Sequence, residues 1–410
     1  MLELTRVREL TPKKIVGEWW EEVKENEEDF WANTDRHLRD LLKQLMESTM
    51  DAEMQCYTGA EWHKRTEKRI DYRNGYRYRD YLTKNGPIRG IRVPRLRKER
   101  FRTKVFKNYQ ARQDAVDKAI RDVFMCGVST RRVGESLSAL LDAPISASTV
   151  SNVSKSLNKY VKEYHNRRID SEYQYLILDA VYLSIRGVAK AKKKAVLVAY
   201  GITMFGEREL IDFQIAGVES EAKWERFLTK LWERGLKGKY LKLITTDGHK
   251  GLKRALETVF SEVRRQACWA HKLRNVSNYL PKKHRKECIS EARKIYLAKN
   301  KVEAAKVYKA WASKWIKIKP QAVRCIEREL DELLAFMDCP EKHRIKVRTT
   351  NVIERAFREV RRRVRTMNCF RNEESCERII YCIFNHLNNH WKQRLLRDFN
   401  QFSKVRSESQ

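Results

Sequence analysis

YQYLILDAVYLSIR, residues 173–186, is a nearly continuous apolar run that contains one acidic residue, Asp179. Such a run is typical of a strand buried on both faces, as in the centre of a sheet. A carboxylate there is costly unless a cation or hydrogen bonds compensate for it, so it commonly binds metal or pairs with arginine. The stretch therefore predicts a central strand with an acidic group that needs a partner.

The segments that follow Asp179 alternate between strand and helix patterns. The predicted order is strand, strand, strand, helix, strand, helix, strand, which gives a mixed sheet with helices on both faces. This order matches an α/β fold with a ribonuclease H-like core. The segments are AVLVAYGIT (195–203), ELIDFQIAG (209–217), ESEAKWERFLTKLWERG (219–235), LKLITTDGHK (241–250), KGLKRALETVF (250–260) and VRRQACWAH (263–271).

A second acidic residue, Asp247, follows LITT at the end of the fourth predicted strand. Ligands of open sheets sit at the carboxyl ends of the strands. If the first and fourth strands are neighbours, Asp179 and Asp247 face one point, and Mg²⁺ or Mn²⁺ would relieve their repulsion. The alternative for each residue is that its carboxylate caps a turn.

A third acidic residue, Glu354, lies in the basic helix pattern RTTNVIERAFREVRRRVRTM. Arg358, Arg361 and Arg365 follow on the same helix face, and Arg362 adds a further cation. A glutamate that holds a metal among arginines that hold phosphates suits a phosphodiester site, where two metal ions support in-line displacement. The alternative is a capping box, in which Asn351 begins the helix and Glu354 reaches back to it.

Cys268 and His271 lie three residues apart in QACWAHKLRN. They have the spacing of half a zinc site, but no convincing second half follows, so we expect a structural role beside the acidic residues. The nine cysteines are an odd number without a CxxC motif, which predicts reduced thiols and no disulfide framework.

The whole chain of 410 residues is strongly basic, with 87 Lys and Arg against 54 Asp and Glu and a net charge of +33. A protein this basic usually binds a polyanion, and nucleic acid is the leading candidate, ahead of membrane surfaces and acidic proteins. No apolar run reaches the roughly 18 residues of a membrane span, and no secretory signal is visible. We expect two to four folding units and a cytoplasmic, nucleoid-associated location.

The N-terminal part divides into a helical and a basic segment. Residues 13–68 have a helical pattern that includes Leu38 and Leu45, which fits either a self-association arm or a simple packed helix pair. Residues 83–112 hold eleven Lys and Arg but one Glu, and turns are predicted at 74–75 and 85–87. This strip suits a phosphate backbone, with a solvated hairpin as the alternative. The candidate contacts are Arg92, Arg95, Arg97, Lys98 and Arg102.

A helix-turn-helix pattern occupies residues 113–165. Ser146 or Ser148 is a suitable N-cap for its second helix, and that helix begins with small polar residues, as recognition helices do. An ordinary helix pair has the same pattern, so the neighbouring basic strip strengthens the DNA-binding interpretation. The candidate contacts are Ser148, Thr149, Ser151, Asn152 and Lys155.

These patterns predict six regions. They are a helical arm (1–68) with a possible role in dimerisation, a basic strand-containing DNA-binding segment (69–112), a helix-turn-helix domain (113–168), a catalytic core (169–271 and 346–396), a helical insertion (272–345) with Trp311, Trp315 and Phe336 as apolar anchors, and a polar tail (397–410).

Several motifs together resemble the bacterial and archaeal insertion-sequence transposases related to Mutator elements. They are LDAVYLSIR, TTDGHKGLKRAL, ACWAHKLRNV and RTTNVIERAFREVRRRVRTM, supported by the basic strip and the helix-turn-helix segment. The resemblance covers nearly the whole chain. It assigns a DDE triad to Asp179, Asp247 and Glu354 and a Cys-x-x-His signature to Cys268 and His271.

The resemblance implies a DNA transposase that binds terminal inverted repeats and target DNA as a homodimer. It implies strand cleavage and strand transfer with two Mg²⁺ or Mn²⁺ ions, through a copy-out, paste-in route with a circular intermediate. One alternative is a ribonuclease H-like nuclease or resolvase that nicks DNA without joining it. Another is a helix-turn-helix regulator without catalysis, whose DNA binding would not respond to chelators.

Overall fold

The computed structural model describes residues 24, 30–61, 64, 66–67, 69–125, 128–187, 190–365, 369–396 and 399. The chain separates into two compact units, an N-terminal unit (1–155) and a C-terminal unit (156–410). Most of the predicted arm before residue 30 and most of the predicted tail lie outside the described residues. In the part of the chain that is described, no helix has both the length and the apolar character of a membrane span.

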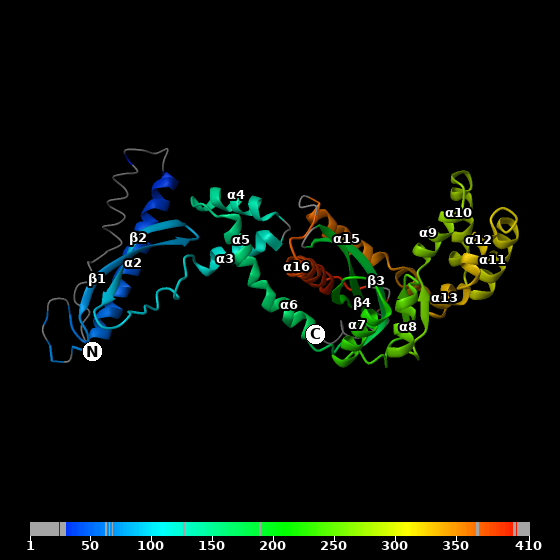
Figure 1. The fold of residues 1–410 in the computed structure, drawn as a ribbon, viewed down its shortest axis with the longest axis horizontal. Helices are drawn as coiled ribbons and strands as arrows, with labels where there is room; N and C mark the ends of the chain where they lie inside the picture. The colour runs from blue at the N-terminus through cyan, green and yellow to red at the C-terminus, as the bar shows by residue number, and fades with distance from the viewer. Residues whose placement is uncertain are drawn as a thin grey trace. The chain divides into compact units, whose positions relative to one another are not determined.

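The described part of the N-terminal unit contains a long helix packed on a hairpin. Helix α2 (Phe30–Thr58) lies along strand β2 (Gly86–Leu96), which pairs antiparallel with β1 (Arg73–Thr83), as Figure 1 shows. Met50 and Met54 of the helix are fully buried against the hairpin. Burial of this apolar face stabilises the unit, because an isolated hairpin is marginal in water. Other members of the core are Tyr81, Ile88, Ile91, Val93, Leu96, Phe101 and Phe106.

The two turns predicted for this segment have different outcomes. The chain reverses at Lys84 and Asn85, since Thr83 pairs with Gly86, so the turn predicted at 85–87 occurs about where expected. The turn predicted at 74–75 is wrong. Gly75 lies inside β1 at a register shift, with a φ of 64°. The Asn-Gly pair thus supplies a left-handed residue for a bulge instead of a chain reversal.

Three helices complete the described N-terminal unit: α3 (Asp114–Met125), α4 (Thr130–Leu141) and α5 (Ala147–Lys155). The backbone N–H of Thr149 donates to Oγ of Ser146 at 3.1 Å, which confirms Ser146 as the predicted cap of the helix that follows. Gly134 of α4 allows a close approach. A Cβ added there would meet the carbonyl oxygen of Ile145 at 2.3 Å.

The C-terminal unit is built on a five-stranded mixed sheet in the order β5-β4-β3-β6-β7. The pairs β3–β4 and β4–β5 are antiparallel, whereas β3–β6 and β6–β7 are parallel. The predicted succession of elements and the central position of the strand with Asp179 are confirmed. The elements are β3 (Tyr173–Arg186), β4 (Ala191–Thr203), β5 (Arg208–Ala216), α7 (Glu221–Glu233), β6 (Leu243–Thr246), α8 (Lys250–Val259) and β7 (Arg265–Ala267).

Helices cover both faces of this sheet (Figure 1). Leu176 and Leu178 of β3 pack with Trp224 and Phe227 of α7 and with α8. Because side chains alternate along a strand, Tyr175, Ile177 and Asp179 point to the opposite face. Helices α15 (Asn351–Val364) and α16 (Glu373–Lys392) contact β3 and β5 respectively. Asp179 therefore points to the face that carries α15.

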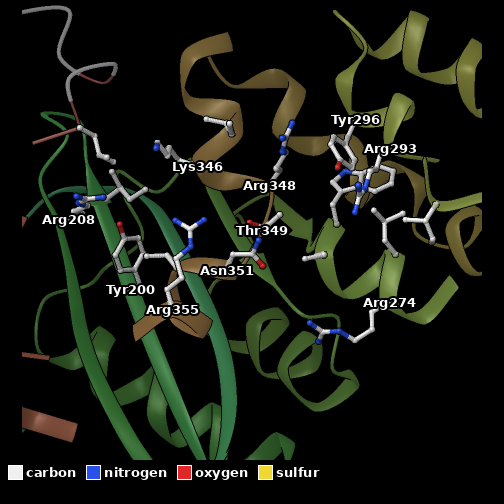
Figure 2. A pocket seen from close by; sticks show the side chains of 18 of the residues that line it. Tyr200, Arg208, Arg274, Arg293, Tyr296, Lys346, Arg348, Thr349, Asn351 and Arg355 are labelled. Atoms are coloured by element: carbon white, nitrogen blue, oxygen red, sulfur yellow. The ribbon is translucent and has the colours of Figure 1, made fainter. Parts of the chain in front are cut away.

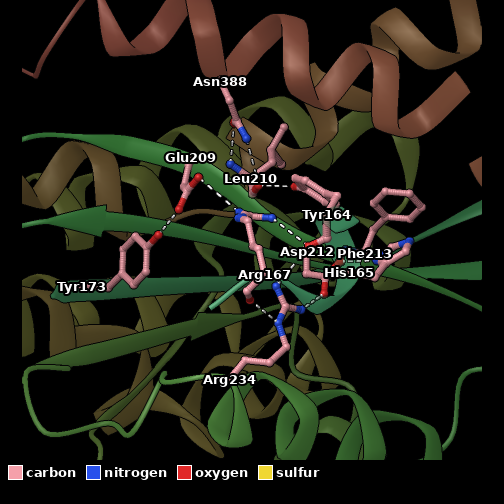
Figure 3. A network of polar contacts seen from close by, with 10 residues as sticks. All are labelled: Tyr164, His165, Arg167, Tyr173, Glu209, Leu210, Asp212, Phe213, Arg234 and Asn388. Carbon is pink, nitrogen blue, oxygen red and sulfur yellow. Dashed lines mark hydrogen bonds and ion pairs between the residues drawn. The ribbon is translucent and has the colours of Figure 1, made fainter. Parts of the chain in front are cut away.

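Helix α6 (Leu157–Asn166) belongs to the C-terminal unit. Nδ1 of its His165 lies 2.6 Å from Oδ1 of Asp212 on β5, and Arg234 pairs with the same carboxylate (Figure 3). The Tyr164 hydroxyl donates to the carbonyl of Leu210. The boundary between the two compact units falls after Lys155, inside the segment 113–168 that was predicted as one region, and α6 makes polar contacts with β5 and with α16.

The region between the sheet and α15 is helical, as expected for 272–345. It comprises α9 (Trp269–Tyr279), α10 (Lys282–Leu297), α11 (Lys301–Trp315), α12 (Pro320–Glu327), α13 (Leu330–Leu334), a 3₁₀ turn η2 (Ala335–Asp338) and α14 (Glu341–Val347). Trp311, Trp315 and Phe336 are buried, as predicted. The indole N–H groups donate to the carbonyl of Cys288 and to the Glu291 carboxylate, so both tryptophans are satisfied in the core.

Candidate active site

The pairing of β3 with β6 brings two of the predicted acidic residues to one position. Ile177 pairs with Thr245 in the parallel register, so Asp179 and Asp247 each lie two residues further along neighbouring strands. Residues two apart share a face of the sheet. The two carboxylates consequently lie side by side on the face that carries α15, where the hydroxyl of Thr245 donates to the carbonyl of Val347 just before that helix.

Asp179 is only 3% exposed and occupies the buried part of the site. Burial, and then the repulsion of Asp247, raise the pKa of Asp179 to about 8. Hydrogen bonds from the Thr350 side chain and the Ala180 backbone oppose this rise, and Glu354 adds to it. A carboxylate so placed strongly favours either a proton or a cation beside it.

Asp247 lies at the mouth of the site and is half-buried. Its Oδ1 accepts from the backbone N–H of His249 at 2.9 Å, so the turn-capping alternative holds for one of its oxygens. Gly248 between them has a φ of 90°, a conformation that glycine adopts without strain. The tight turn leaves the second carboxylate oxygen for another partner.

Glu354 lies in the first turn of α15. The capping-box alternative is wrong, because the helix begins at Asn351 with Thr350 as its N-cap and without a side-chain cap bond. Glu354 instead faces α9. Its Oε1 lies 3.2 Å from Nη2 of Arg274 and 3.5 Å from Nε2 of His271. The carboxylate therefore remains within reach of the Asp179 site, where its charge contributes to the raised pKa of Asp179.

Cys268 and His271 meet at Thr350. The backbone N–H of Thr350 donates to Sγ of Cys268 at 3.3 Å, and its hydroxyl oxygen lies 3.4 Å from Nδ1 of His271. Burial raises the pKa of the Cys268 thiol and lowers the pKa of His271, so both side chains favour their neutral forms. Through these contacts, Cys268 and His271 link α9 to Thr350 at the start of α15.

The donor set at this site fits a hard divalent cation in its chemistry. Mg²⁺ and Mn²⁺ prefer carboxylate oxygens, and a cation would offset the burial and repulsion that raise the pKa of Asp179. In the described residues, no three ligating side chains are gathered into a ready-made ion site. Glu354 contacts Arg274 and His271, so its carboxylate is not gathered with those of Asp179 and Asp247 into one cluster.

Three residues of the site were not among the sequence-predicted ones. Thr350 precedes Asn351 in the quoted motif, and nothing in the pattern distinguishes its hydroxyl from that of Thr349. Arg274 follows His271 by three residues on α9, and this helical spacing is a usable signal. Glu219 has a 5% exposed side chain that accepts from the Tyr182 hydroxyl and the Trp224 indole, and a single Glu in a loop carries no such signal.

The predicted phosphate-binding residues of the C-terminal unit lie on exposed positions of α15. Arg358 and Arg361 are exposed, and Arg365 ends the helix. Arg362 is exposed as well, and its guanidinium pairs with Glu359 at 2.9 Å. This region thus presents cations to solvent beyond Glu354.

The predicted contacts of the N-terminal unit are also mostly on its surface. Arg95, Arg97, Lys98 and Arg102 are exposed, while Arg92 pairs with Glu47 of α2 at 2.8 Å. Arg92 therefore stabilises the packing of α2 on the hairpin as well. On α5, Ser148, Asn152 and Lys155 are exposed and Thr149 and Ser151 are half-buried, with Asn152 accepting from Lys155 at 3.2 Å.

Comparison with known proteins matches residues 18–394 to the family model described as Transposase, Mutator family. The chain is 34% identical over 356 residues to the transposase for insertion sequence element ISRM5 of Rhizobium meliloti, and the aligned region covers 87% of this chain and 89% of that protein. It is 35% identical over 353 residues to the IS406 transposase of Burkholderia multivorans, covering 85% and 90%. It is 31% identical over 368 residues to the IS256 transposase of transposon Tn4001 of Staphylococcus aureus, covering 86% and 90%. The chain therefore belongs to the Mutator family of transposases.

Proposed function

We propose that this protein is a DNA transposase that cuts and joins DNA at Asp179, Asp247 and Glu354, on a sheet of the ribonuclease H-like type. The observation that carries the proposal is the parallel pairing of β3 with β6, which sets Asp179 beside Asp247 under the first turn of α15. Membership of a transposase family and named insertion-sequence relatives support the activity.

The three carboxylates would hold two Mg²⁺ or Mn²⁺ ions, which supply activation of the attacking oxygen and stabilisation of the leaving oxygen. Asp179 would be the most firmly positioned ligand, because burial and Thr350 restrict it. Asp247 would offer the oxygen that its turn leaves unused. Arg274 and His271 hold Glu354 beside the site and would release it to bind metal.

The N-terminal unit would bind the terminal inverted repeats. Helices α4 and α5 form the proposed helix-turn-helix, with the exposed polar residues of α5 toward the major groove. Arg95, Arg97, Lys98 and Arg102 are exposed and would contact phosphates. Arg92 would contribute less, because Glu47 already compensates its charge.

Transposition joins two element ends, so we expect a homodimer on DNA. Leu38 and Leu45 lie seven residues apart on α2 and are 40% and 60% exposed. This spacing places them on one helix face, which supports the self-association arm over an internally packed pair. The copy-out, paste-in route through a circular intermediate is part of the same proposal and rests on the family resemblance alone.

Strand cleavage and joining on labelled DNA that carries the element's ends tests the proposal. Asp247→Asn and Glu354→Gln should abolish products, and EDTA should abolish them in the wild type. Glu233→Gln, an exposed carboxylate on α7, is the matched control and should act like wild type. Products that survive both variants and EDTA would exclude the triad.

The two alternatives separate in the same assay. A nuclease or resolvase would nick without joining in Mg²⁺ and Mn²⁺. A non-catalytic regulator would bind DNA with a salt-dependent affinity that neither EDTA nor Asp179→Ala changes. The close arrangement of Asp179 and Asp247 favours the transposase over the regulator, because burying Asp179 beside a second carboxylate costs stability that DNA binding alone does not require.

A further inference from the structure

A cavity of about 610 Å³ lies next to the candidate active site in the C-terminal unit (Figure 2). Strands β4 and β5, helices α9 and α10, and the segment that leads into α15 line it. Six of its lining residues are cationic, and none of its lining residues, all from the described part of the chain, is acidic. The cations are Arg208, Arg274, Arg293, Lys346, Arg348 and Arg355.

The charge of this cavity is largely uncompensated. Among the described residues, Arg274 alone of the six cations forms an ion pair, and its partner is Glu354. Two others rest on aromatic rings, with Arg348 4.5 Å from the centre of Tyr296 and Arg208 5.1 Å from that of Trp391. The remaining three, Arg293, Lys346 and Arg355, are exposed. Six cations around one space repel one another. A polyanion bound in the cavity would reduce this electrostatic repulsion.

The cavity lies beside Glu354, one of the three carboxylates, although Glu354 is not itself a lining residue. Arg274 lines it and also contacts Glu354 at 3.2 Å. Thr349, Asn351 and Arg355 line it as well, and these residues flank Thr350 and Glu354 in sequence. An extended anion that reaches the carboxylates can therefore place its next charged groups against these cations.

We propose that this cavity binds the phosphate backbone of a DNA strand next to the strand position that is cut. The proposal rests on the proposed function and deepens it. Six cations spread over 610 Å³ exceed what a single phosphate ion requires, whereas consecutive phosphates of one strand would engage several of them. The aromatic rings of Tyr296 and Trp391 hold two of the guanidinium groups in place, which lowers the entropy lost on binding.

The test measures DNA affinity without catalysis. In an Asp247→Asn background, Arg293→Gln, Lys346→Gln and Arg355→Gln are made singly and together, and the dissociation constant of a short labelled duplex of arbitrary sequence is measured against KCl concentration. Each lost phosphate contact should reduce the slope of log K against log salt by about 0.9. The triple variant should bind on the order of 10- to 100-fold more weakly.

Lys309→Gln is the matched control, because it removes one exposed cation from α11, outside the cavity. Thermal melting of every variant monitors folding, and Arg293→Lys should retain the slope of the Asp247→Asn parent. A triple variant with the affinity and slope of the Lys309 control overturns the proposal. A higher melting temperature with unchanged DNA affinity also overturns it, since the cations would then only repel one another. Either result leaves the proposed function standing if the wild type still joins DNA in a metal-dependent way.

Discussion

At the scale of single residues, the site depends on one buried hydroxyl. Thr350 is fully buried and contacts Cys268 and His271, and its side chain hydrogen-bonds Asp179. His271 in turn lies beside Glu354. Thr350 thus connects the buried aspartate to the residues that hold the glutamate, and it is a positioning residue without contact to DNA in this scheme.

Thr350→Val should keep the shape of this position and remove its hydrogen bonds. We expect the rate of strand cleavage to fall on the order of 10- to 100-fold, as for other partners of ligating groups. DNA affinity should stay unchanged, and Thr350→Ser should restore most of the rate. Single-turnover cleavage and equilibrium binding measure the two effects separately. A variant with weaker DNA binding and an unchanged cleavage rate would contradict the assignment.

Asp179 makes the stability of the metal-free protein depend on pH. Its pKa is about 8 in the folded protein, against 3.8 as its ordinary value. The folded state therefore binds a proton more tightly, and the contribution of Asp179 to stability falls as pH rises from about 4 to about 8. Asp179→Asn removes this loss, because a neutral amide needs no proton.

We expect Asp179→Asn to raise the melting temperature in EDTA by at least about 3 °C more at pH 8 than at pH 5, because the stability loss caused by Asp179 grows over this interval. Differential scanning fluorimetry between pH 5 and pH 9 measures this. Asp170→Asn, at an exposed position of the same unit, is the control. An equal shift at both pH values would show that packing, and not ionisation, causes the effect.

At the scale of elements, the sequence predicts the sheet better than the surfaces around it. The alternation of strands and helices after Asp179 is strong, because buried strands and amphipathic helices have different apolar periods. The sequence pattern predicts a turn at Gly75 and groups α6 with α3–α5. In the structure, Gly75 forms a bulge in β1 and α6 belongs to the C-terminal unit, because tertiary contacts decide both. The basic cavity was not predicted at all. Arg208, Arg293 and Lys346 are far apart in the sequence, and no local pattern indicates that they share one space.

Gly134 of α4 shows how an element contact can oppose local propensity. Alanine is normally the better helix residue by about 1 kcal/mol. A Cβ at this position would lie 2.3 Å from the carbonyl oxygen of Ile145, so Gly134→Ala must push α4 away from the start of α5. We expect a lower melting temperature and weaker binding of the element's ends. Gly217→Ala is the control, since a Cβ there meets nothing within 4 Å. A Gly134→Ala variant as stable as wild type would contradict this close approach.

At the scale of the whole molecule, the division into two units predicts how the chain can be cut. The boundary lies between Lys155 and Ser156, which keeps α6 with the sheet. His165 of α6 lies against Asp212, a 5% exposed carboxylate, and Arg378 of α16 donates to Asn158 of α6 at 2.7 Å. Removal of α6 would leave both buried charges with fewer partners.

A fragment of residues 156–410 should therefore unfold cooperatively, and a fragment of 169–410 should melt at a markedly lower temperature or fail to fold. The physical reason is that breaking a buried ion pair or hydrogen-bonded charge costs about 3–5 kcal/mol. His165→Ala in the longer fragment should reproduce part of the loss, while Tyr160→Ala, at a half-exposed position of the same helix, should not. Thermal unfolding followed by circular dichroism makes the comparison. Equal stability of the two fragments would contradict the assignment of α6 to the C-terminal unit and would favour the prediction of 113–168 as one domain.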